Sequence, residues 1–92
     1  MALLTYQVTL GAAATQLTTT RKGVRQLLFM PAAHAYYIGK SNVDSTHGIG
    51  VFPTAVECTS VGPFSGDAPA NTNEFYLSGT QNDVIQVLAI TH

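Results

Sequence analysis

The amino-terminal stretch LLTYQVTL (residues 3–10) alternates apolar and polar side chains at every second position. Leu4, Tyr6, Val8 and Leu10 share one face, and threonine and glutamine occupy the other. This two-residue period is typical of a β-strand with one buried face, and the β-branched and aromatic residues favour the same structure. Because no stretch keeps a 3.6-residue apolar period over three turns, we expect strands and no long helix.

Further apolar runs bounded by glycine and proline predict the remaining strands. We expect a short strand or extended connection within residues 12–23, and strands within residues 24–30, 35–39, 55–61, 74–80 and 84–91. GTQND, between the last two runs, is typical of a hairpin loop. The segments 40–53 and 62–73 are rich in turn-forming residues, so we expect loops there.

Six to eight short strands at spacings of about 8–12 residues are the usual pattern of an all-β sandwich or barrel. A chain of 92 residues has room for one hydrophobic core. The sequence therefore predicts an all-β fold with one domain that spans residues 1–92.

The last predicted strand, residues 84–91, is apolar on both faces. The apolar residues of one face are Val84, Leu88 and Ile90, and those of the other are Ile85, Val87 and Ala89. A strand that is apolar on both faces is covered on both. Since one face meets the core in a two-sheet fold, we expect the other to meet a loop or another subunit.

The chain has few charges. Only 10% of its residues are Asp, Glu, Lys or Arg, against about 25% in typical soluble domains. Its net charge of −1 gives little self-repulsion, and the centres of protein interfaces are depleted in charge. We therefore expect other subunits to cover much of the surface, and a homo-oligomer.

Neither nucleic acid nor a membrane is expected as a partner. Four basic residues are too few for the basic face of a nucleic-acid-binding domain, and no segment has the apolar length that crosses a bilayer. Arg21, Lys22 and Arg25 do cluster, either as a solvated turn or as a basic knob that docks on an acidic protein surface. The amino terminus lacks the positive region of a signal peptide, so we expect synthesis in the cytoplasm.

The segment YYIGKSNVDSTHGIGVFP contains the residue types of a catalytic site. Ser41, Asp44 and His47 are spaced by three, but their neighbours favour a turn, on which a Ser–His–Asp triad has no fixed geometry. Asp44 and His47, with His34 or His92, are too few and too loosely spaced for a zinc site. We therefore expect no enzyme activity, no metal and no cofactor.

Turn formation accounts for the same segment more completely. Asn42 and Asp44 can each bond the backbone two residues on. Gly48 and Gly50 permit positive φ where the chain reverses, and Phe52 supplies an aromatic anchor before the next strand. We therefore interpret the segment as a structured turn that reverses the chain between two strands.

The order of motifs between residues 35 and 92 resembles a family of small structural proteins of tailed bacteriophages. The motifs are YYIGKSNVDSTHGIGVFP, EFYLSGTQND and VIQVLAITH. The resemblance implies a virion component with an antiparallel β-sandwich or jelly-roll-like fold, made in the host cytoplasm and built into the particle. Within this class it implies a capsid decoration (cement) protein, often trimeric, which sits on the outer capsid where major capsid subunits meet. The long 62–73 loop and the basic Arg21–Lys22 pair depart from the family's usual pattern.

Two other functions stay open. The first is a tail, neck or fibre-base module of the same fold. The second is a carbohydrate-binding β module, in which Tyr36, Tyr37, Phe75 or Tyr76 would stack on sugar rings, although aromatic residues of strands are more often core. For subunit or capsid contacts, the candidate residues are Arg21, Lys22, Arg25, Phe52, Ile85 and Val87.

Overall fold

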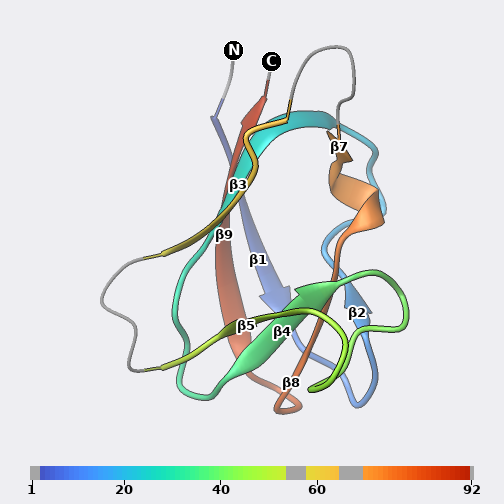
Figure 1. Cartoon of the computed structure of the whole chain (residues 1–92), viewed down its shortest axis with the longest axis vertical. Helices are drawn as coiled ribbons and strands as arrows, with labels where there is room; N and C mark the ends of the chain where they lie inside the picture. Colours follow the sequence, from blue (N-terminus) through green and yellow to red (C-terminus); the bar gives the residue numbers. More distant parts are fainter. Residues whose placement is uncertain (1–2, 54–57, 65–69, 92) are drawn as a thin grey trace.

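The chain folds into two antiparallel β-sheets (Figure 1). The computed structural model describes residues 3–53, 58–64 and 70–91. In the first sheet the order is β1 (Leu3–Thr9), β9 (Val84–Thr91), β3 (Gly23–Phe29) and β6 (Thr59–Val61), and β7 (Ala70–Asn71) pairs with the start of β3. In the second sheet the order is β2 (Thr15–Gln16), β8 (Tyr76–Gly79), β4 (Tyr36–Gly39) and β5 (Ile49–Val51). A 3-10 turn, η1 (Thr72–Glu74), follows β7.

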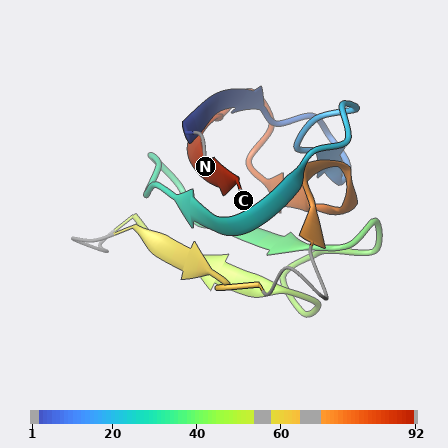
Figure 2. The same ribbon diagram turned by 90° about the horizontal axis from the view of Figure 1, so that it is seen from above.

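The predicted all-β, antiparallel sandwich is confirmed. Seen from above, β1 and β9 lie on one side of the molecule and β4 and β5 on the other (Figure 2). The side chains that form the hydrophobic core are Val8, Leu10, Leu17, Val24, Leu27, Phe29, Tyr36, Ile38, Val51, Leu77, Ile85, Val87 and Ala89. Both sheets supply core residues, so each sheet buries the apolar face of the other.

The alternation expected for residues 3–10 is confirmed. Val8 and Leu10 are buried in the core, and Leu4 and Tyr6 pack against it. Strict alternation through residues 24–30 would place Val24 on the side of Gln26 and Leu28, and Arg25 on the side of Leu27. This expectation is wrong at the start of β3, because the pairing with β9 shifts by one residue between Val24 and Gln26. This β-bulge leaves Arg25 exposed and turns Val24 to the core face.

Two segments expected as loops contain short strands. β5 lies within residues 40–53, where it pairs with β4, and β7 lies within residues 62–73, where it pairs with β3. Both are too short to show an apolar period, so long-range pairing forms them. The strand expected within residues 55–61 begins at Thr59, and residues 54–57 lie outside the described residues.

Candidate functional site

The side of the five-stranded sheet that faces away from the core is the candidate functional site, which we call the outer face. Residues directly opposite each other in an antiparallel pair point to the same side of the sheet. The register of β1, β9, β3 and β6 therefore defines the face. Its residues are Leu3, Thr5, Gln7, Thr9, Val84, Gln86, Leu88, Ile90, Gln26, Leu28, Met30 and Ser60.

The outer face has no ionisable side chain and several exposed apolar ones. The exposed fraction is 65% for Leu3, 45% for Met30 and 43% for Val84. Leu28 and Leu88, which pair directly, lie half-buried near the middle of the face. Apolar side chains among uncharged ones are typical of the centre of a protein interface. Arg25, the bulge residue beside Gln26, is exposed next to this face.

Two of the predicted contact residues, Ile85 and Val87, are not on this face. They are 0% and 2% exposed and point into the core, so their prediction as contacts is wrong. Because β9 is apolar on both faces, its sequence does not tell which face turns inward. The face of Val84 and Leu88 is the open one.

The basic residues Arg21, Lys22 and Arg25 are all exposed. The turn that carries the first two is held by Thr72, which is fully buried. The Thr72 hydroxyl donates to the Thr20 carbonyl at 2.7 Å and accepts from the Lys22 amide at 3.0 Å. In the part of the chain that is described, the ion pairs involve histidines and none of these three cations.

Phe52 is 52% exposed and packs edge-on against Tyr37, with ring centroids 6.4 Å apart. A Cβ at Gly50 would lie 2.8 Å from the Phe52 ring. Gly50 therefore makes room for an aromatic ring and does not adopt the positive φ that we expected. At Gly48, positive φ is confirmed, with a value of 144°. That Phe52 contacts another subunit stays a prediction.

Asp44 organises the turn between β4 and β5. Its Oδ1 accepts from the Thr46 hydroxyl at 2.7 Å and from the Thr46 amide at 2.8 Å, which confirms the expected Asx turn. The same oxygen lies 2.9 Å from His47 Nδ1. These hydrogen bonds, with that of the Thr46 hydroxyl first, hold the pKa of Asp44 well below its usual range.

The three residues considered as a triad do not assemble into one. Asp44 and His47 are exposed, and no hydrogen bond in the described segments joins Ser41 to either. His34 Nδ1 lies 2.8 Å from Asp83 Oδ2 instead, in the loop before β9. His92 lies outside the described residues. Among those described, no group of three His, Cys, Asp or Glu side chains could hold a metal ion.

The prediction that Tyr36 could stack on a sugar ring is wrong. Its ring is fully buried, and its hydroxyl donates to the Met30 carbonyl at 2.6 Å. Burial raises the pKa of Tyr36 well above its usual range. Tyr37, Phe75 and Tyr76 are half-buried.

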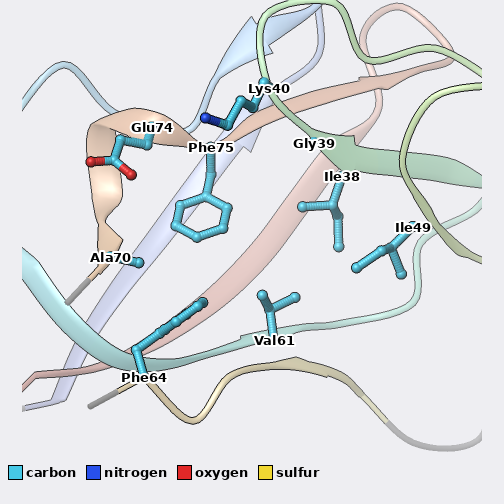
Figure 3. A pocket seen from close by; sticks show the side chains of 9 residues that line it. All are labelled: Ile38, Gly39, Lys40, Ile49, Val61, Phe64, Ala70, Glu74 and Phe75. Carbon is cyan, nitrogen blue, oxygen red and sulfur yellow. The ribbon is translucent and has the colours of Figure 1, made fainter. Parts of the chain in front are cut away.

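An apolar pocket of about 240 Å³ lies between the two sheets (Figure 3). The side chains that surround it are Ile38, Ile49, Val61, Phe64, Ala70 and Phe75, and Lys40 and Glu74 lie together along one side. This volume is below the roughly 300–1,000 Å³ of typical small-molecule sites.

Sequence reasoning missed this pocket, the anchoring role of Thr72 and the contact between His34 and Asp83. The pocket residues come from segments as far apart as β4 and β7, so no local pattern brings them together. A single threonine in a segment rich in turn-forming residues gives no signal of burial.

The described residues contain no helix that is long and apolar enough to span a bilayer. No protein-family model, no curated protein and no solved structure matches this chain.

Proposed function

We propose that this chain is a structural protein of a tailed bacteriophage virion, a decoration protein that binds the outer surface of the capsid and stabilises the head. The observation that carries the proposal is the outer face, where exposed Leu3, Met30 and Val84 lie among uncharged side chains. Such a face is suited to burial against the major capsid protein.

The strand order supports the proposal. When the two-residue β7 is set aside, the sheets read β1-β9-β3-β6 and β2-β8-β4-β5. We interpret this order as that of a jelly roll, a double-sheet architecture that viral capsid proteins use. Because one fold hosts many functions, the order adds to the proposal and does not carry it.

The outer face can supply part of the free energy for docking. Full burial of an exposed Leu, Val or Met side chain stabilises by roughly 1.5–3 kcal/mol. Leu3, Met30 and Val84 are 65%, 45% and 43% exposed, so burial of the remaining surface would give roughly 2–5 kcal/mol before the loss of translational and rotational freedom is subtracted. One copy would therefore bind weakly through these residues alone, and a homo-oligomer that contacts several capsid subunits would gain avidity.

The exposed basic residues would orient the chain on the capsid surface. Arg25 directly precedes Gln26 of the outer face, and Arg21 and Lys22 lie in the turn just before the same strand. Charges at the rim of an interface mainly accelerate association and select the partner. We therefore expect an acidic patch on the capsid beside the apolar contact.

Co-sedimentation of the full chain with empty capsids of the phage that encodes it tests the proposal. Val84→Glu and Met30→Glu each place a negative charge on the outer face and should weaken binding at least tenfold, since a buried charge without a partner is costly and the expected capsid patch is itself acidic. Ile49→Glu is the matched control: Ile49 is 52% exposed, but lies on β5 of the other sheet and lines the pocket.

The expected result is binding by the wild-type chain and by the Ile49 variant only. Equal binding by all variants, or loss in the Ile49 variant alone, would contradict docking through the outer face. Antibody labelling of whole particles then distinguishes head from tail, since label on the tail alone would replace the decoration protein with a tail, neck or fibre-base module.

A further inference from the structure

β1 is an edge strand whose free side lacks the features that normally protect an edge. It pairs with β9 over all seven residues, Leu3–Thr9, without a bulge, and it contains no proline and no charge. Natural sheets usually blunt an edge with lysine, proline, a bulge or a very short strand. The other outer strands, β2, β5 and β6, have only two or three residues each, so β1 is the long, regular exception.

The hydrogen-bond pattern shows which main-chain groups of β1 are free. The Leu10 amide, just past β1, donates to the Asp83 carbonyl at 2.8 Å. Since bonded residues alternate along an antiparallel strand, the even-numbered residues of β1 bond to β9. The amides and carbonyls of Thr5, Gln7 and Thr9 therefore point away from the sheet, and in the described parts of the chain β1 has no second strand partner.

The core side of β1 is also incompletely covered. Leu4 and Tyr6 face the core but are only half-buried. Among the described strands, the seven residues of β1 pair with β9 alone. An added strand beside β1 would satisfy the free backbone groups and complete the burial of these two side chains.

We propose that the added strand is β1 of a second copy of this chain. Two copies would pair antiparallel about a two-fold axis at Tyr6, so that the first sheets of both copies become one continuous sheet. In this register Thr5 of one copy lies opposite Gln7 of the other in a hydrogen-bonded pair, and Leu3 lies opposite Thr9. On the core side, the two Tyr6 rings meet.

The register is self-complementary in three respects. It uses every residue of β1, it opposes the free amides and carbonyls of one copy to those of the other, and it keeps core-facing residues on the core side in both copies. Leu4 of one copy then lies opposite Val8 of the other, an apolar pair on the core side. Because β1 contains no charged residue, the pairing brings no like charges together. The resemblance led to an expected trimer, whereas this edge specifies a dimer.

The dimer is independent of the proposed function, because it uses the edge of the sheet and leaves the outer face open. It is tested first without any variant. Light scattering of the full chain should give a mass twice the 9.7 kDa of one copy. On dilution, the amides of Thr5 and Gln7 should exchange with deuterium faster, while the Tyr6 amide, which bonds to β9, should stay protected.

A charge-swap pair tests the register. The double variant Thr5→Lys with Gln7→Lys opposes like charges at both pairs beside the axis, and should raise the dissociation constant roughly tenfold or more. The double variant Thr5→Glu with Gln7→Glu should do the same. An equimolar mixture of the two should restore a dimer, because each lysine then faces a glutamate. The matched control, Gln26→Lys with Gln86→Lys, puts the same charges on the outer face away from the edge and should stay dimeric.

A mass of one or three copies at every concentration, or amide exchange that does not change on dilution, would overturn the proposal. So would a lysine variant that stays dimeric, or a mixture that fails to restore the dimer although each variant unfolds cooperatively in urea. If the wild-type chain forms the dimer but does not bind capsids, the proposed function is contradicted and the dimer is not.

Discussion

The buried hydroxyl of Thr72 gives the sharpest test of how this fold is held together. Thr72→Val removes the hydroxyl and keeps the shape of the side chain. The Thr20 carbonyl then loses a donor at 2.7 Å and the Lys22 amide loses an acceptor at 3.0 Å. The amide of Thr72 keeps its own bond to the Lys22 carbonyl, so the change isolates the side-chain oxygen.

The expected cost follows from these two bonds. Each intramolecular hydrogen bond contributes about 0.5–1.5 kcal/mol net, and an unpaired buried group costs about 1–3 kcal/mol. Thr20 and Lys22 belong to an exposed turn, so water can replace part of the lost hydrogen bonding. We therefore expect a loss of about 2 kcal/mol in the free energy of unfolding. For a domain of this size, that lowers Tm by roughly 8–16 °C.

Urea unfolding followed by circular dichroism measures the loss, and hydrogen exchange at the Lys22 amide locates it. Thr72→Ser is the control, because it keeps the oxygen and removes one methyl group, at a cost of about 1 kcal/mol. The Lys22 amide should exchange faster in the valine variant and not in the serine variant. If the valine variant unfolds within about 0.5 kcal/mol of the wild type, or leaves that amide protected, the turn is held by other contacts and the reasoning is refuted.

Three further predictions concern the region of β4 and its turn. Tyr36→Phe should lower the free energy of unfolding by about 1–3 kcal/mol in urea, because it leaves the Met30 carbonyl without its donor at 2.6 Å. Gly48→Ala should destabilise clearly, since φ is 144° and the new Cβ would lie 2.6 Å from a carbonyl oxygen, whereas Gly23→Ala, with no atom within 4 Å, should leave the urea midpoint nearly unchanged. The lowered pKa of Asp44 contributes stability that is fully present above the ordinary aspartate pKa of about 3.9, so the stability difference from Asp44→Asn should shrink in urea titrations as the pH falls from that value toward the lower pKa of the folded state.

Local patterns predicted much of the fold. The alternation of Leu4, Tyr6 and Val8 with polar residues identified β1 and its core side, because a strand displays alternate residues on opposite faces. The apolar run of residues 84–91 predicted the strand β9. Its expected cover on the second face is not supplied by a loop in the described residues, where Val84 is 43% exposed, and cover by another subunit stays a prediction.

Local sequence patterns did not predict the features that depend on pairing with a neighbouring strand. The bulge at Arg25 turns Val24 to the core side, against strict alternation at the start of β3, and it appears as a shift in the pairing of β3 with β9. β5 and β7 have too few residues to carry a pattern and are formed by their neighbours. The outer face was not predicted residue by residue: Ile85 and Val87 turn to the core, and the contact roles of Arg21 and Phe52, which lie off this face, stay predictions. The pocket joins segments that are distant along the chain.

By itself, the sequence determined that the chain forms short antiparallel strands around one core and that its surface has few charges. Both properties are set by neighbouring side chains and by composition. Only the tertiary structure decided that Ile85 and Val87 turn inward while Val84 and Leu88 stay open, and that β1 lies at an edge. The physical reason is that the face and the edge of a strand are defined by what packs beside it, and that contact joins residues far apart in the chain.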